Sequence, residues 1–166
     1  ALEPPPGVEV VAVTTAEDMA EAVLARGEEM DIIVKSAAVA DFKPTACQSL
    51  KIKKTGQGLH LDLVKNVDIL AALGKRRRPG QILVGFAAES HNHEQEGQRK
   101  LREKHLDLIV VNDILGNRTG FDVETNQVTL ISQTYSRQLP LLSKEETADR
   151  IWDAVVALFD QTQVSS

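Results

Sequence analysis

The sequence has a single cysteine, Cys47, among its 166 residues, and this excludes an internal disulfide. Stability must therefore come from a packed core, and a chain of this length can bury most of its apolar surface without cross-links. Cys47 stands in a polar stretch with no histidine close by in sequence, so a nucleophilic role is disfavoured. This use of cysteine fits a reducing compartment.

Long apolar runs are also missing, because no stretch approaches the ~20 residues of a membrane span. The net charge of −5 argues against a dedicated nucleic-acid binder. The hydrophobic content of 42% and the charged content of 26% are ordinary for a globular protein. The length predicts one domain, residues 1–166, with no internal boundary.

Two phosphate-binding signatures are absent, namely G-x-x-x-x-G-K-[ST] and G-x-G-x-x-G. The histidines do not form a metal-binding set, because His91 and His93 stand two apart and no cysteine nearby completes a site. We therefore predict no metal site made by the protein alone.

The first 35 residues predict a β-α-β unit. Residues 8–13 are mostly β-branched, as in a strand buried on both faces. Thr15 and Asp18 resemble a capping box that opens a helix over residues 16–26, and residues 31–34 form the next strand. Such a unit implies parallel strands and a right-handed crossover.

The remaining chain predicts a hairpin arm, three helices and four strands. The arm pairs residues 51–54 with residues 59–63 around a glycine-containing turn, and the whole arm covers about residues 43–63. Asn66 and Asn92 are candidate caps of the first two helices, and Ser143 with Glu146 forms a capping box for the last. The helices are expected at 67–73, closed by Gly74, at 93–104 and from 143 to about 161. The strands are expected at 81–87, 108–111, 127–132 and 135–139. The last two strands form an antiparallel extension.

Small or polar residues follow three of the predicted parallel strands, in residues 36–41, 85–89 and 112–113. Because the carboxyl ends of parallel strands meet at one edge, this pattern predicts a ligand site there. Tight packing of helices on the strands explains small residues equally well.

Individual residues at this edge have two interpretations. Asp41 is a turn former or a ligand for a hydroxyl group or a metal ion. Phe86 is a core aromatic or a platform on which a base stacks. Lys51, with its neighbours, protects a hairpin edge or meets phosphates. Lys100 and Lys104 share a helix face and repel each other unless an anion lies between them, which favours a phosphate contact.

Taken together, these stretches resemble one family, phosphopantothenoylcysteine synthetase, the ligase half of the bifunctional bacterial flavoprotein of coenzyme A biosynthesis. The resemblance covers nearly the whole chain and rests on co-linear motifs: AAVADF at 37–42, KIKK at 51–54, LVKN at 63–66, VGFAAE at 84–89, Lys100, and LIVVND at 108–113. It implies an α/β fold with a Rossmann-like, mostly parallel sheet, helices on both faces, a hairpin flap and a dimer in the cytoplasm.

The resemblance also implies a reaction and the residues for it. Phosphopantothenate and cysteine are joined through an acyl-nucleotidylate, usually with CTP in bacteria and with Mg²⁺ present. The implied nucleotide contacts are Ser36, Ala37, Asp41, Lys51, Val64, Lys65, Asn66, Val67, Phe86, Lys100 and Lys104. Lys51 is the implied catalytic residue, on a flap that closes over the intermediate.

Two departures from the family stand out. The family's first strand, its glycine-rich turn and its upstream FMN-binding decarboxylase domain have no match in residues 1–13. We therefore expect a truncated ligase domain that binds CTP weakly and has little ligase activity alone. Lys35 stands where the family tends to have a small or apolar residue.

Two alternatives remain open at the level of sequence. A degenerate relative could keep the dimer and the pocket as a regulatory or assembly module. A sugar-nucleotide or dinucleotide enzyme could share the general sheet, although the charged arm and Asp41 disfavour it.

Overall fold

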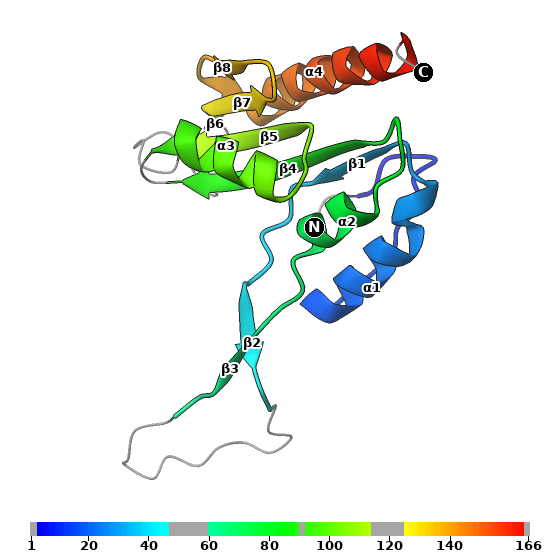
Figure 1. Ribbon diagram of the computed structural model, residues 1–166, viewed down its shortest axis with the longest axis vertical. Coiled ribbons are helices and arrows are strands. Elements are labelled where there is room, and N and C mark those ends of the chain that lie inside the picture. Colours follow the sequence, from blue (N-terminus) through cyan, green and yellow to red (C-terminus); the bar gives the residue numbers. More distant parts are fainter. Residues whose placement is uncertain (1–2, 47–59, 90–91, 114–124, 165–166) are drawn as a thin grey trace.

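The computed structural model describes residues 3–46, 60–89, 92–113 and 125–164. Its main sheet has five strands in the order β1-β4-β5-β7-β8. Their bounds are β1 Ile32–Lys35, β4 Ile82–Glu89, β5 Leu108–Asp113, β7 Val128–Ser132 and β8 Ser136–Gln138. The first three strands are parallel, and β7 and β8 join antiparallel. The predicted parallel sheet with an antiparallel extension is confirmed (Figure 1).

Helices cover both faces of the sheet, as predicted. Their bounds are α1 Ala16–Arg26, α2 Ile69–Arg76, α3 His93–Glu103 and α4 Lys144–Val164, with a short 3-10 turn at Gly27–Glu29. Alternation along each strand divides the core in two. Leu83 and Ile109 contribute to the cluster under α1, α2 and α3, whereas Val84 and Val110 contribute to the cluster under α4.

Two helices begin at the capping boxes that the sequence predicts. The Asp18 backbone N–H donates to Thr15 Oγ1 at 3.1 Å, and the Thr15 N–H donates to the Asp18 carboxylate at 2.9 Å. Ser143 and Glu146 make the same reciprocal pair at 3.1 and 2.9 Å. Each box satisfies two backbone or hydroxyl groups that the helix cannot satisfy itself.

Two short antiparallel pairs lie outside the main sheet. One joins β2 Phe42–Pro44 to β3 Leu63–Lys65 at the base of the predicted arm, which extends away from the sheet (Figure 1). The other joins β6 Thr125–Asn126 to β9 Leu142–Ser143 and was not predicted. Lys51, Cys47 and the turn of the arm lie outside the described residues.

The predicted strand at residues 8–13 is wrong, because these residues form no strand and pair with no strand of the sheets. Val8 and Val10 are 56% and 62% exposed. A groove of about 570 Å³ is lined by Val11 and Val13 of this segment together with residues of α1 and β1. Without a hydrogen-bonding neighbour, a β-branched run has no ladder to join.

Of the two predicted asparagine caps, Asn66 is wrong, and Asn92 holds the N-cap position of α3 but does not cap with its side chain. Helix α2 begins at residue 69 and not 67, and its cap is Asp68, which accepts from the Ala71 N–H at 3.1 Å. Asn92 has a left-handed backbone, and its side chain makes no capping bond. Gly74, the predicted end of α2, lies inside the helix. This position requires glycine, because the Cβ of any other residue would collide with the backbone of Lys104.

Candidate functional site

A cavity of about 310 Å³ opens at the carboxyl ends of the three parallel strands. The loop after β1, the end of β4, the start of α2 and one face of α3 line it. Eight of the residues predicted to bind a nucleotide are among its lining: Ser36, Ala37, Asp41, Asn66, Val67, Phe86, Lys100 and Lys104. Open α/β sheets bind ligands at this edge.

Three predicted residues are not in this lining. Val64 and Lys65 lie on β3, and both are exposed. Lys51 lies outside the described residues, so its catalytic role stays a prediction. The arm base nevertheless joins the cavity, because the Asn66 N–H donates to the Asp41 carbonyl and the Asn66 side-chain amide donates to the Ala40 carbonyl, each at 2.8 Å.

Helix α3 lies close to the sheet, and this places its two lysines over the strand ends. At Gly97, an added Cβ would meet Ile131 Cδ1 at 2.5 Å and Val111 Cγ2 at 2.8 Å, so only glycine permits this approach without a shift. Lys100 and Lys104 follow one and two turns later, on the side that lines the cavity.

Each of these lysines has its own carboxylate. Lys100 Nζ lies 2.5 Å from Glu89 Oε1 at the end of β4, and Lys104 Nζ lies 2.9 Å from Asp68 Oδ2. The expected repulsion between the lysines is therefore compensated by the protein itself. An anionic ligand would have to share the lysines with these carboxylates or displace them.

Asp68 serves both as the cap of α2 and as the partner of Lys104. Burial alone would raise the pKa of its carboxyl group. The hydrogen bonds from Lys104 and the Ala71 N–H, together with the charges of Lys104 and Lys35, outweigh burial and lower the pKa below its ordinary value. Sequence reasoning missed this residue, although an Asp directly before an apolar helix is a cap signal.

Phe86 and Asn112 share the sheet face opposite to the lysines. Phe86 is half-buried, contacts the core under α4 and also lines the cavity. Asn112 lines the same cavity, and its buried Oδ1 atom has no hydrogen-bond partner. An unsatisfied buried carbonyl costs about 1–3 kcal/mol, so a ligand that donates an N–H or O–H group there would recover this energy.

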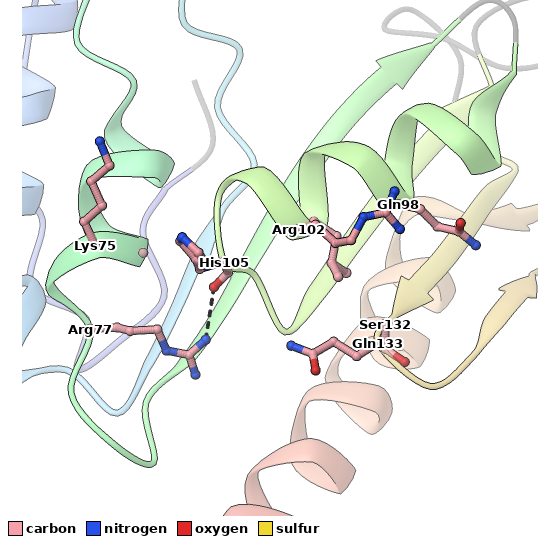
Figure 2. A pocket seen from close by; sticks show the side chains of 9 residues that line it. Lys75, Arg77, Gln98, Arg102, His105, Ser132 and Gln133 are labelled. Carbon is pink, nitrogen blue, oxygen red and sulfur yellow. Dashed lines mark hydrogen bonds between the residues drawn. The ribbon is translucent and has the colours of Figure 1, made fainter.

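A larger hollow, of about 980 Å³, lies at the other edge of the sheet (Figure 2). Lys75, Arg102 and His105 make its lining basic. The last turns of α2 and α3 end beside it, and their free carbonyls disfavour an anion. Arg77 is already engaged, because it donates to the His105 carbonyl at 3.0 Å and pairs with Asp107. The smaller cavity is therefore the candidate site.

Among the described residues, no group of three or more His, Cys, Asp or Glu side chains is placed to hold a metal ion. The cavity lining holds two carboxylates: Asp68 pairs with Lys104, whereas no cationic side chain in the described ranges pairs with Asp41. One carboxylate from the protein is a usual number for Mg²⁺, which takes most of its other ligands from water and substrate phosphates. In the part of the chain that is described, no helix is both long and apolar enough to cross a membrane.

The fold and cavity define a class, an open α/β domain with a basic ligand cavity at the carboxyl ends of its parallel strands. The family model described as DNA/pantothenate metabolism flavoprotein C-terminal domain matches residues 1–159, and the chain belongs to this family. The resemblance noted in the sequence is thereby confirmed.

Known relatives agree with this membership. The coenzyme A biosynthesis bifunctional protein CoaBC of Bacillus subtilis is 44% identical over 163 residues, which are 97% of this chain and 40% of that protein. A crystal structure of the C-terminal domain of CoaBC matches 97% of this chain and 71% of its own, at 35% identity and a TM-score of 0.79. A Cab2 variant in complex with phosphopantothenate-cysteine, at 16% identity and a TM-score of 0.68, shares the fold. The chain thus spans 40% of the length of the Bacillus relative.

Proposed function

We propose that this domain carries the ligase site of a coenzyme A biosynthesis protein, where 4'-phosphopantothenate is joined to cysteine with CTP. The observation that carries the proposal is the convergence of Asp41, Phe86, Lys100 and Lys104 on one cavity. Family membership supports it, as do the relatives named CoaBC and the fold shared with a protein solved with phosphopantothenate-cysteine.

The proposed reaction has two steps. An oxygen of the phosphopantothenate carboxylate attacks the α-phosphorus of CTP, the bond to the leaving pyrophosphate breaks, and an acyl-cytidylate forms. The amine nitrogen of cysteine then attacks the acyl carbon, loses a proton and displaces CMP, leaving the amide. Both steps move negative charge onto phosphate oxygens, so fixed cations lower the barrier.

The residues of the cavity divide between the two ends of a nucleotide. Phe86 offers an aromatic face to the base, and Asn112 offers its unsatisfied oxygen beside it. Lys100 and Lys104 meet the phosphates from α3. Asp41 would hold a ribose hydroxyl or a Mg²⁺ ion, and that ion would supply further neutralisation of phosphate charge when bound.

Three further elements belong to the proposal as expectations. The arm would close over the acyl intermediate and keep water away, and it would supply Lys51. The domain would act as a homodimer. Its place of action would be the cytoplasm, where cysteine and CTP are available.

The test is a titration with CTP, ATP and NAD, comparing the chain with its Phe86→Ala variant. Base stacking on an aromatic side chain contributes about 1–3 kcal/mol, so Phe86→Ala should weaken CTP binding by about tenfold or more. Phe42→Ala is the matched control, because Phe42 is a half-exposed aromatic of the arm base outside the cavity lining.

Binding of CTP that is tighter than that of NAD, and that depends on Phe86 but not on Phe42, supports the proposal. Preference for NAD would favour a dinucleotide enzyme. Equal losses in the two variants would remove Phe86 from the site.

A further inference from the structure

Lys35 is a basic residue of the cavity with no role in the function described so far. It ends β1, opposite Gly85 of β4, and its side chain lines the same cavity as Lys100 and Lys104. Its Nζ atom donates to the Ala37 carbonyl at 2.8 Å, which holds the ammonium group over the strand ends. The cavity therefore contains three lysines, contributed by two separate elements.

The surroundings of Lys35 make its positive charge costly. Burial lowers the pKa of the ammonium group, and the nearby charge of Lys104 lowers it further, while Asp68 opposes the shift. An anion placed between the lysines would remove this cost. Lys35 thus favours a negatively charged occupant of the cavity.

The three lysines differ in what they must give up to bind an anion. Lys100 is paired with Glu89, and Lys104 is paired with Asp68. Within the described ranges, no carboxylate lies within ion-pair distance of Lys35, whose bond goes to a neutral carbonyl. Exchanging a carbonyl for a phosphate oxygen replaces a neutral partner of the ammonium by an anionic one, and this adds the attraction between two opposite charges to the hydrogen bond.

We propose that Lys35 is a third phosphate-binding cation, which together with Lys100 and Lys104 holds the polyphosphate of a nucleoside triphosphate. The inference rests on the proposed function, because it names a residue for the phosphates of the same nucleotide. Lys35 makes the affinity for a nucleotide depend on its number of phosphates. Phe86 lies on the other face of the sheet and contacts the base.

The experiment measures the affinities of CTP and CMP for the chain and for Lys35→Gln, Lys35→Arg and Lys75→Gln. Lys35→Gln removes a hydrogen bond between charged groups, and the binding free energy lost with it should weaken CTP binding about tenfold. CMP binding should change much less, because it lacks the outer phosphates. Lys35→Arg keeps the charge and should retain most of the CTP affinity. Lys75→Gln makes the same charge change on an exposed lysine of the last turn of α2, outside the cavity, and should have little effect.

Thermal melting of each variant checks folding, and Lys35→Gln should melt no lower than the natural sequence because it removes a charge that burial disfavours. A CTP affinity in Lys35→Gln equal to the original overturns the inference and leaves the proposed function standing. Equal losses in Lys35→Gln and Lys75→Gln also overturn it, as a general effect of charge. If the unchanged chain binds neither CTP nor CMP, the proposed function fails and this inference fails with it.

Discussion

At the scale of single residues, the charges of the cavity are arranged in pairs that cross between elements. Lys104 at the end of α3 meets Asp68 at the start of α2, and Lys100 meets Glu89 at the end of β4. Each pair ties two elements together at the edge of the site. The lysines are therefore held in position before a ligand arrives, which lowers the ordering cost of binding, while the ligand must still share them with the carboxylates or displace these.

The pair of Asp68 and Lys104 should make stability depend on acid pH. Because the pKa of Asp68 is lowered in the folded state, its contribution is present above the ordinary value of 3.8 and is lost as the pH falls through the folded value. Asp68→Asn keeps a capping side chain but removes the charge. The pair is half-exposed, so we expect a loss of only about 0.5–1 kcal/mol at pH 7 that disappears in strong acid.

Urea unfolding at pH 7 and in strong acid measures this difference. Asp149→Asn is the control, because Asp149 is an exposed carboxylate of α4 with no pairing in the described part of the chain. A loss in Asp68→Asn that stays the same at both pH values would show that the ion pair contributes nothing.

Residue-scale prediction from sequence succeeded where the signal was local and failed where it depended on packing. Asp41, Phe86, Lys100 and Lys104 were placed at one edge because each lies near the end of a predicted strand or on a predicted helix. Asp68 was missed because two polar residues, two positions apart, could each have capped α2. The unsatisfied oxygen of Asn112 has no sequence signal at all, since it depends on what surrounds the atom.

At the scale of elements, glycines set how closely helices approach the sheet and each other. At Gly74 an added Cβ would lie 2.0 Å from the carbonyl oxygen of Lys104, so α2 touches the end of α3 backbone to backbone. This contact brings the start of α2, with Asp68, and the end of α3, with Lys104, to the same cavity. A sequence pattern shows such glycines only as interruptions, and here Gly74 was misread as the end of a helix.

Gly74→Ala should destabilise the domain, although alanine is the better helix former by about 1 kcal/mol. The clash is with backbone, so α2 and α3 must separate, and overpacking of this kind costs about 1–3 kcal/mol. Gly27→Ala is the matched control, because its Cβ would approach side-chain atoms, Leu73 Cδ2 at 2.6 Å and Ile33 Cδ1 at 3.8 Å, and no backbone atom.

Melting temperatures and CTP affinities of the two variants give the comparison. We expect Gly74→Ala to melt lower and to bind CTP less tightly than Gly27→Ala. Equal melting temperatures for Gly74→Ala and the unchanged chain would contradict the packing argument.

At the scale of the whole molecule, the three parallel strands and their connections place the site. The order of the strands, helices and capping boxes could be predicted because short apolar runs mark the buried strands and helical period marks the helices. The strand predicted at residues 8–13 failed because a ladder needs a neighbour, and neighbours are a property of the fold. The β6–β9 pair was missed because two-residue strands carry no period.

The two hollows lie at opposite edges of one sheet, so the position at which a nucleotide binds tests the proposed site most directly. The measurement is a CTP titration followed by the shifts of backbone amide signals in a ¹H–¹⁵N spectrum. We predict that the largest shifts belong to residues of the smaller cavity, among them Ala37, Ala88 and Lys100. Shifts concentrated at Arg102, Ser132 and the rest of the larger hollow, or no shifts at all, would contradict the claim that this edge of the sheet binds a nucleotide.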